Sequence, residues 1–333
     1  MTMEKNAKIY VAGHRGMVGS AIVRRLHADD YSNIICRTHQ ELDLLDQGAV
    51  RAFMQAEQPE YVFLAAAKVG GILANSSYPA EFIQQNLAIQ TNVIHEAYRA
   101  GVKRLLFLGS SCIYPRDCPQ PIKEEYLLTG PLEPTNRPYA IAKIAGIEMC
   151  WSYNRQYGAQ YLAVMPTNLY GPGDNYDLAD SHVLPALICK MHQAKQLGNR
   201  EVTVWGTGTP RREFLYSEDM ADACIYLMRL PDAQFRQLLN ADGPPLINIG
   251  CGEDLTIEEL AELIREIIGF QGRIIFDPGK PDGTPRKLLN IEKLNSLGWD
   301  SRVALKDGIE RSYKDYLNTL LADEATISPV ADA

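Results

Sequence analysis

Tyr139 and Lys143 lie four residues apart in the run YAIAK. On a helix, this spacing places both side chains on one face, a single turn apart. A phenol has an ordinary pKa of about 10, so it exchanges protons poorly at neutral pH. A neighbouring ammonium group favours the phenolate and lowers that pKa, which would make the pair a proton-transfer unit. The same spacing arises by chance in surface pairs on many helices, so the surrounding segments must decide between the two interpretations.

Ser110 gives this pair a chemical context. It follows a β-rich run at 104–108 (RLLFL), and a Pro-rich loop at 115–138 separates it from the helix of Tyr139. Strands that alternate with helices predict a parallel sheet, whose carboxyl ends form the ligand crevice. Ser110, Tyr139 and Lys143 in this order and setting predict hydride chemistry at a carbonyl group. Ser110 would bind the carbonyl oxygen, Tyr139 would exchange the proton, and Lys143 would tune the phenol and hold a cofactor ribose.

A glycine-rich turn near the N-terminus predicts a dinucleotide site. The β-rich run at 8–12 (KIYVA) leads into glycines at 13, 16 and 19, and a helical pattern follows at 20–27. Such a turn lets the backbone approach a pyrophosphate, with the amides of a helix N-terminus facing the anion. The alternative is a strand-to-helix turn that binds no ligand. The candidate cofactor residues here are Gly13, His14, Arg15, Gly16, Met17, Val18 and Gly19.

The end of the second predicted strand, at 33–36, indicates which dinucleotide would bind. A fold that prefers NAD usually has an acidic residue here, which accepts hydrogen bonds from the ribose. This chain instead has Arg37 and His39, which together with Arg15 would surround a 2′-phosphate and favour NADP. The alternative is that Arg37 is only a solvated charge. Asp43 and Leu44 follow as an acidic and apolar pair, expected beside the adenine.

Further elements continue the alternation of strands and helices. The sequence predicts a helix at about 46–57, a buried strand at 61–67 (YVFLAAA) and a long helix at about 79–100. The loop that begins at Lys68 could reach a substrate. Asn86 lies within the long helix, where it is either a satisfied core amide or a residue that holds water near an active site.

The overall composition limits the classes of function. A net charge of −8 without a compensating basic run argues against a general nucleic-acid binder. No apolar run reaches the roughly 18 residues of a membrane span, and the N-terminus lacks an apolar signal region, so we expect a cytoplasmic protein with no membrane partner. The seven cysteines include no CxxC pair or metal-like cluster, so the sequence predicts no metal site.

These motifs together resemble the extended short-chain dehydrogenase/reductase family, whose members act on nucleotide-activated sugars. The resemblance covers roughly residues 8–318 and is carried by AGHRGMVG, LAAAKVGGI, GSSCIYP, PTNRPYAIAKIAG, MPTNLYGPGDN and KPDGTPRKLLN. It implies an α/β fold, with a Rossmann-like doubly wound parallel sheet and a smaller α/β C-terminal substrate domain. It also implies NADPH/NADP⁺ as cofactor, with further contacts from Leu108, Gly109, Ser110, Ser111, Lys143, Pro166, Thr167, Asn168, Leu169 and His182.

Domain boundaries follow from the loss of the strand–helix rhythm after residue 175. Residues 1–175 and about 213–240 would form the cofactor domain, whereas about 176–212 and 241–320 would form the substrate domain. The run LINI at 246–249 and a helix at 256–268 would belong to the substrate domain. Thr256 is the predicted N-cap of this helix, with Glu259 three residues later. Residues 321–333 are expected to form a flexible tail. The resemblance also implies a homodimer, formed through the helices near 79–100 and 139–157.

The resemblance further implies a substrate and a reaction. Several motifs of this chain most resemble those of family members that act on GDP-4-keto-6-deoxy-D-mannose. The C4 ketone of this sugar acidifies the protons at C3 and C5. The resemblance assigns the proton transfers that invert these carbons to Cys112 and His182. NADPH would then reduce C4 while Tyr139 donates a proton to O4. The alternatives are an inert buried thiol at Cys112 and a structural role for His182.

The GDP part of the substrate needs binding residues as well. The resemblance places four of them around it, namely Lys190, Trp205, Arg212 and Lys287, although the cations among them could instead be solvated surface charges. Two rival functions stay open. Another nucleotide-sugar epimerase/reductase of the same family, such as an NAD-dependent 4-epimerase, would not need the pair Cys112 and His182. A non-catalytic dinucleotide-sensing protein would need only the glycine-rich turn.

Overall fold

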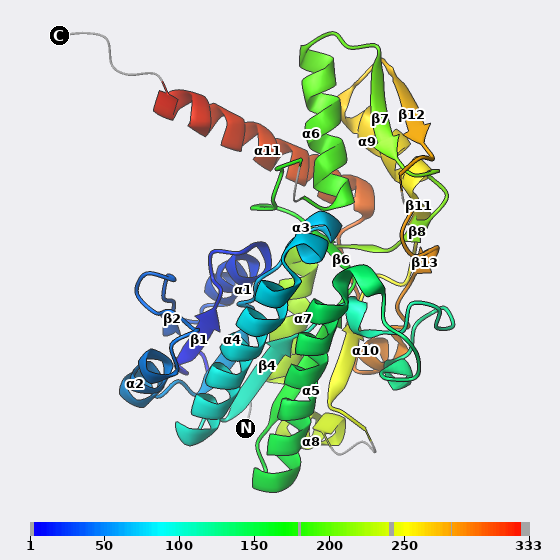
Figure 1. Ribbon diagram of the computed structural model, residues 1–333. Helices are drawn as coiled ribbons and strands as arrows, with labels where there is room; N and C mark the ends of the chain where they lie inside the picture. Colours follow the sequence, from blue (N-terminus) through cyan, green and yellow to red (C-terminus); the bar gives the residue numbers. More distant parts are fainter. Residues whose placement is uncertain (1–2, 179–180, 240–242, 281, 328–333) are drawn as a thin grey trace, which may run out of the picture.

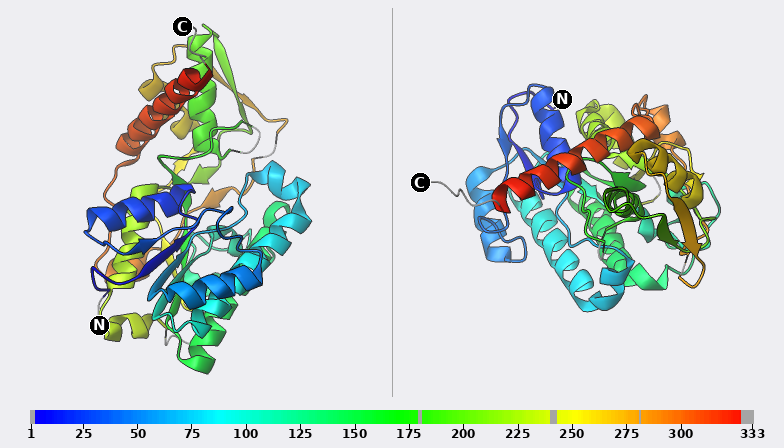
Figure 2. Two further views of the ribbon diagram at one scale, coloured as in Figure 1. Left: turned by 90° about the vertical axis from the view of Figure 1, so that its left-hand side faces the viewer. Right: turned by 90° about the horizontal axis from the view of Figure 1, so that it is seen from above.

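The computed structural model describes residues 3–178, 181–239, 243–280 and 282–327, which fold into a larger and a smaller part (Figures 1 and 2). The larger part is built around a six-stranded parallel sheet in the order β10-β5-β4-β3-β1-β2. Its strands are β1 (Ile9–Ala12), β2 (Ile34–Ile35), β3 (Tyr61–Leu64), β4 (Arg104–Leu108), β5 (Tyr161–Pro166) and β10 (Leu246–Ile249). The smaller part lies beyond the carboxyl ends of these strands.

Helices cover both faces of the large sheet and complete a three-layer α/β structure. One face carries α1 (Met17–Ala28), α7 (Ser217–Arg229) and α8 (Asp232–Leu239). The other face carries α2 (Gln47–Glu57), α4 (Pro79–Arg99) and α5 (Arg137–Tyr157). The fold class predicted from the sequence is thereby confirmed.

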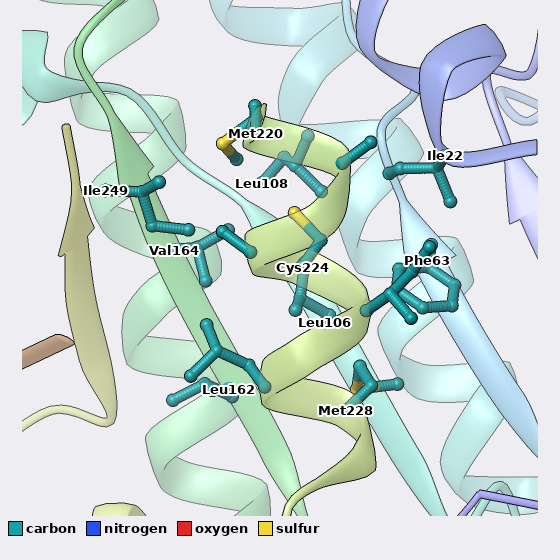
Figure 3. Close-up of a cluster of buried hydrophobic side chains, with 14 of the residues drawn as sticks. Ile22, Phe63, Leu106, Leu108, Leu162, Val164, Met220, Cys224, Met228 and Ile249 are labelled. Carbon is teal, nitrogen blue, oxygen red and sulfur yellow. The ribbon is translucent and has the colours of Figure 1, made fainter. Parts of the chain in front are cut away.

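Side-chain alternation along the strands supplies both helix layers with core contacts. In β4, Leu106 and Leu108 pack with the α1 and α7 layer, whereas Leu105 and Phe107 pack with the α4 and α5 layer. Figure 3 shows the first of these layers, in which Met220, Cys224 and Met228 of α7 lie over the strands. Because both faces are buried, the strands are nearly continuous apolar runs.

The smaller part surrounds its own apolar cluster. It contains α6 (Val183–Gln196), α9 (Ile257–Ile268), α11 (Leu305–Ile327) and the parallel pair β7 (Glu201–Trp205) and β12 (Arg273–Asp277). Two small sheets connect it to the larger part: β6 (Asn168–Tyr170) with β9 (Phe214–Tyr216), and β8 (Arg211–Arg212) between β11 (Leu255–Thr256) and β13 (Arg286–Lys287). The remaining helices are α3 (Ile72–Ser77) and α10 (Glu292–Ser296). Among the described residues, no helix combines the length and apolarity needed to cross a bilayer.

Successive strands are placed on opposite sides of β1 in the large sheet. β2 lies on one side of β1, whereas β3, β4 and β5 follow on the other side. In open parallel sheets, the crevice beyond such a switch point is where ligands bind. The glycine turn after β1 and Ser110 after β4 both lie at this edge, which brings the predicted chemistry to one place.

Two expected boundaries are wrong. The run at 246–249, which we expected in the substrate domain, forms β10 and pairs with β5 at the edge of the large sheet. Tertiary pairing, which the sequence of this short apolar run does not contain, decides the sheet to which the run belongs. Helix α11 continues to Ile327 and includes 321–327 of the expected tail. Residues 328–333 of that tail lie outside the described residues.

A buried carboxylate joins the two parts of the molecule. Glu213 is fully buried between β8 and β9. Its Oε1 accepts hydrogen bonds from the amides of Cys251 (2.7 Å) and Gly252 (2.8 Å), just after β10. Its Oε2 accepts one from the amide of Leu289 (3.0 Å), just after β13. Glu213 therefore fixes the edge of the large sheet against the strands that carry Arg212 and Lys287.

Glu213→Gln should lower the thermal unfolding midpoint of the protein. A glutamine amide can accept only through its oxygen, so its NH₂ group must face one of the amides that Glu213 now satisfies. Leaving a buried donor without a partner costs about 1–3 kcal/mol. Glu125→Gln serves as the matched control, because Glu125 is exposed. Equal midpoints for the two variants would contradict this structural role of Glu213.

Candidate active site

The end of β4 and the start of α5 bring Ser110, Tyr139 and Lys143 to one site. Ser110 caps a short 3₁₀ turn at 111–113, and its Oγ accepts a hydrogen bond from the Cys112 amide at 3.4 Å. Lys143 is buried, and its Nζ donates to the carbonyl oxygen of Leu108 at 2.8 Å. The same Nζ lies 5.7 Å from the centre of the Tyr139 ring. The predicted helical pair therefore faces the strand end that carries Ser110.

The electrostatics of the pair differ from the expectation. Burial raises the pKa of Tyr139 above the ordinary value for a phenol, and the nearby Cys112 raises it further. Burial also lowers the pKa of Lys143 to about 8. The expected lowering of the phenol pKa by Lys143 is therefore wrong for this arrangement, because loss of solvent disfavours both charged forms. The site favours a neutral phenol, which is the form that donates a proton.

Cys112 lies in the same site, on the short turn after Ser110. It is 8% exposed and lines a small cavity together with Asn136, Glu133 and Lys287. Burial raises the pKa of the Cys112 thiol, whereas the charge of Lys287 and a hydrogen bond with Ser110 act in the opposite direction. The thiol thus faces a cation and hydrogen-bonding groups, in contrast to the apolar surroundings of an inert core cysteine.

His182 approaches the site from the other part of the molecule, as the N-cap residue of α6. His182 is an exposed residue. Neighbouring protein atoms that displace water lower the pKa of His182, and the positive charge of Lys287 lowers it further. Lys287 therefore acts on both Cys112 and His182, which shows that these three side chains share one electrostatic environment.

The glycine-rich turn has the geometry that a dinucleotide diphosphate requires. A Cβ atom at Gly13 would lie 2.7 Å from the amide nitrogen of Ala66, and one at Gly19 would lie 2.1 Å from the carbonyl oxygen of Gly13. Helix α1 begins after Gly16 without a side-chain cap and without an acidic residue in its first turn. Its N-terminal amides and positive dipole end are thus available to an anion. The turn 13–19 fits the predicted cofactor.

The basic residues expected around a 2′-phosphate occupy one region. The guanidinium of Arg37 lies 2.7 Å from Oε1 of Glu57 and packs over the ring of Phe53. Arg15 is exposed on the glycine turn. Hydrogen bonds from Thr38 lower the pKa of Glu41, and the charges of Arg37 and Arg15 lower it further. His39 is also exposed. Since Glu57 already holds Arg37, the exposed Arg15 is the more accessible of the two arginines.

The other predicted cofactor residues lie on the segment before α2 and around the ends of β4 and β5. Asp43 accepts a hydrogen bond from the Leu45 amide, and the carbonyl of Leu44 accepts one from Asn92. A Cβ at Gly109 would lie 2.1 Å from the methyl group of Met165, so the backbone there packs closely. After β5, the side chains of Thr167 and Asn168 both donate to the carbonyl oxygen of Glu213. The other residues of this group are Leu108 and Pro166 at strand ends, Ser111 on the turn and Leu169 in β6.

The predicted substrate cations fall into two groups. Arg212 and Lys287 are in register on neighbouring parallel strands, β8 and β13. The preceding residues of these strands, Arg211 and Arg286, both pair with Asp254. Strand alternation turns consecutive side chains to opposite faces, so Arg212 and Lys287 face away from this carboxylate. Among the described residues, neither has a carboxylate within ion-pair distance.

Lys190 and Trp205 form the second group. The Lys190 ammonium lies 5.8 Å from the centre of the Trp205 ring, and Trp205 is more than half exposed. Lys280 approaches the same ring at 5.4 Å. The sequence reasoning missed Lys280, although it lies in the KPDGTPRKLLN motif that carried the resemblance. An exposed indole between two ammonium groups suits a planar, electron-rich ligand.

Asn86 has a structural role that the sequence left open. It is buried, and its Oδ1 accepts from the Lys68 amide at 3.0 Å. Its Nδ2 donates to the carbonyls of Lys68 (3.0 Å) and Phe82 (2.7 Å). Both polar atoms are therefore used within the protein. Asn86 is a satisfied core amide that holds the loop beginning at Lys68 beside the site.

Known proteins share this fold and these motifs. Residues 9–250 match the model of the NAD dependent epimerase/dehydratase family. The GDP-L-fucose synthase 1 of Arabidopsis thaliana is 56% identical over 317 residues, which cover 95% of this chain and 95% of that protein. The GDP-L-fucose synthase of Escherichia coli K12 is 53% identical over 312 residues, which cover 93% of this chain and 96% of that protein.

A solved structure extends the comparison to the arrangement in space. The GDP-mannoheptose C4 reductase of Campylobacter jejuni with NADP bound is similar with a TM-score of 0.86 and 42% identity. The similarity covers 95% of this chain and 99% of that chain. Together with the strand–glycine–helix turn and the Ser110, Tyr139 and Lys143 constellation, these matches identify the chain as a member of the NAD dependent epimerase/dehydratase family, within the extended short-chain dehydrogenases/reductases.

Proposed function

We propose that this protein converts GDP-4-keto-6-deoxy-D-mannose to GDP-L-fucose. The reaction inverts C3 and C5 and then reduces the C4 ketone with NADPH. The observation that carries this proposal is the placement of Cys112 beside Ser110, in the same site as Tyr139 and Lys143. A reductase alone needs the last three residues, whereas inversion next to a ketone also needs a base and an acid. The similarity to GDP-L-fucose synthases supports the substrate.

The cofactor residues have distinct roles in this proposal. The turn 13–19 binds the diphosphate, and Arg15, Arg37 and His39 bind the 2′-phosphate. Asp43 and Leu44 contact the adenosine, and Lys143 holds the nicotinamide ribose. The bound cofactor supplies the hydride for C4. The segments 108–111 and 166–169, together with His182, complete the walls of the cofactor site.

Proton transfers at the sugar follow from the side chains around Ser110. Cys112 removes a proton next to the ketone, and the electron pair moves to the ketone oxygen, where Ser110 and Tyr139 stabilise the charge. His182 then delivers a proton to the opposite face of the same carbon. In the reduction, the neutral phenol of Tyr139 donates its proton to O4. Arg212, Lys287, Lys190 and Trp205 bind the GDP part.

The domain assignment and the oligomeric state are part of the proposal. The large sheet, with β10 included, forms the cofactor domain, and the part built on α6, α9 and α11 forms the substrate domain. A homodimer would use the outer faces of α4 and α5. Tyr98 and Tyr157 support this choice, because both are exposed there and their rings stack at 4.4 Å.

The first experiment measures absorbance at 340 nm with GDP-4-keto-6-deoxy-D-mannose and NADPH, followed by identification of the product. Loss of NADPH with formation of GDP-L-fucose is the expected result. Formation of a product reduced at C4 but not inverted would instead favour a C4 reductase, such as the structurally similar C. jejuni protein. If NADPH is not consumed, this substrate assignment is wrong and other keto-sugar nucleotides must be tested.

Arg15→Ala should raise the KM for NADPH about tenfold or more and leave the KM for NADH unchanged. A charge-assisted hydrogen bond to phosphate contributes about 1.5–3 kcal/mol, and NADH has no phosphate at this position. Arg15 is a cleaner test than Arg37, whose removal would also release Glu57. Arg200→Ala is the control for loss of a distant positive charge. An equal loss of affinity for both cofactors would contradict the 2′-phosphate assignment.

A further inference from the structure

Lys287 differs from its neighbour Arg286 in having no paired carboxylate. Arg286 pairs with Asp254, but no carboxylate of a described residue lies within ion-pair distance of Lys287. The backbone around Lys287 is nevertheless fixed. Its carbonyl accepts from the Glu213 amide at 3.3 Å, and the Leu288 amide donates to Gln120 at 2.8 Å. A rigid strand thus holds an unpaired ammonium group at a defined place.

That place is the cavity beside Cys112. Lys287 and Cys112 line the cavity together, along with Arg116, Glu133 and Asn136. The carboxylate of Glu133 lies 3.5 Å from the guanidinium of Arg116, so it is already paired. The amide oxygen of Asn136 is buried and has no hydrogen-bond partner among the described residues. Cys112 and Lys287 therefore line the same small polar cavity.

A buried thiol is a poor base unless a cation stabilises its thiolate. Among the groups that act on Cys112, Lys287 has the largest charge effect in favour of the thiolate. The Ser110 hydroxyl and Lys143 have smaller effects in the same direction. Tyr139 also lies near Cys112. Burial lowers the pKa of Lys287 itself and the charge of Arg212 lowers it further, whereas Cys112, Cys118 and Glu133 favour the ammonium form. If Lys287 served only to bind diphosphate, a position near the base of the epimerisation would not be required.

We propose that Lys287 stabilises the Cys112 thiolate that removes the sugar proton, and so controls epimerisation in addition to binding the substrate. This inference rests on the proposed function. In the step concerned, the C–H bond next to the ketone breaks, an S–H bond forms at Cys112, and the electron pair moves to the ketone oxygen. His182 then donates a proton to the opposite face and restores the ketone. The same Lys287 charge makes the His182 imidazolium a stronger acid, which suits this second transfer.

The first test requires no substrate. Iodoacetamide alkylates thiolates, and mass spectrometry of the Cys112 peptide separates its rate from those of the other cysteines. We expect Lys287→Met to move the pH midpoint of Cys112 alkylation upward by about one unit or more, which lowers the rate at pH 7 about tenfold. Lys287→Arg should restore most of the rate, because it restores the charge. An unchanged alkylation profile in Lys287→Met would overturn the inference.

The second test separates thiolate stabilisation from substrate binding. At saturating substrate in deuterated water, Lys287→Met should incorporate deuterium at C3 and C5 at least tenfold more slowly than the unaltered protein. Lys190→Met is the matched control, because it also removes a substrate cation but lies against Trp205. This comparison variant should raise KM, leave the alkylation profile unchanged, and slow the deuterium rate at saturation far less than Lys287→Met does. Equal deuterium rates in the two variants would leave Lys287 with a binding role only.

The two proposals can fail separately. If the protein does not accept GDP-4-keto-6-deoxy-D-mannose, the proposed function fails, but the alkylation profile still reports whether Lys287 controls the Cys112 thiol. If the substrate is turned over and the alkylation profile is unaffected by Lys287→Met, the function stands and this inference fails. Thermal unfolding of Lys287→Met and Lys287→Arg checks that both variants are folded.

Discussion

Tyr139→Phe should lower the rate of NADPH oxidation by about 10²- to 10⁴-fold, the usual contribution of a positioned general acid. The variant loses only the hydroxyl group that donates a proton to O4. Among the described residues, no hydrogen bond holds the Tyr139 hydroxyl, so its removal should cost little stability. The aromatic ring keeps its edge contact with Phe82, at 6.3 Å between centres. Stopped-flow absorbance at 340 nm measures the effect directly.

NADPH binding separates the catalytic role of Tyr139 from a role in the cofactor site. Calorimetry should give a dissociation constant for Tyr139→Phe within a few-fold of the original value. Tyr157→Phe is the matched control, because Tyr157 lies on the same helix and is exposed. It should react at the original rate. If Tyr139→Phe keeps more than a tenth of the activity, another group must supply the proton.

The pH dependence of the reduction should reflect the environment of this pair. Because Lys143 has its pKa lowered to about 8, its ammonium loses its proton as the pH rises through this value. Tyr139 remains a neutral phenol over the same range, since burial raises its pKa. An alkaline loss of reduction would therefore report the Lys143 ammonium and not the phenol.

Cys112→Ser should abolish inversion at C3 and C5 while the C4 reduction continues. A serine hydroxyl has nearly the same shape but is far less acidic than a thiol, so it does not provide the base. We expect NADPH to be consumed and the product to keep the original configuration at both carbons. Nuclear magnetic resonance of the purified sugar nucleotide distinguishes this product from GDP-L-fucose.

Cys118→Ser tests whether the effect is specific to Cys112. Cys118 follows on the neighbouring loop and is a free, partly buried cysteine. Its replacement should leave GDP-L-fucose as the product. Normal formation of GDP-L-fucose by Cys112→Ser would exclude Cys112 as the base. If Cys112→Ser loses both NADPH oxidation and inversion, Cys112 supports the whole site and not one proton transfer.

Several parts of the fold could be predicted because the signal is local. The buried strands β3 and β4 are nearly continuous apolar runs, and both are predicted from the sequence, although β3 ends at Leu64 and not at residue 67. The predicted cap of α9 is also confirmed, since Thr256 accepts from the Glu259 amide and the Glu259 side chain accepts from the Thr256 amide. Each of these features depends on residues within a few positions of one another.

Other features depend on partners that are distant in the chain. The sequence predicts the wrong part of the molecule for β10, because a short apolar strand pairs equally well with any open sheet edge. Asn86 remained ambiguous until its contacts with Lys68 and Phe82 were known. No local sequence pattern indicates the structural role of Glu213, since its carboxylate accepts hydrogen bonds from amides that lie 38 to 76 positions away.

The order of the elements, the glycine turn, and the spacing of Tyr139 and Lys143 on one helix are all legible in the amino-acid sequence. Helical and strand periodicities are properties of the chain, so these features need no tertiary information. The proton affinities and the charge environment of the site, in contrast, depend on the folded structure. Burial raised the pKa of Tyr139 where a lowered value was expected, and the pairing of β8 with β13 brought Arg212 and Lys287 together. Solvent exclusion and the distances between charges depend on every segment packed around the site, and no local pattern contains them.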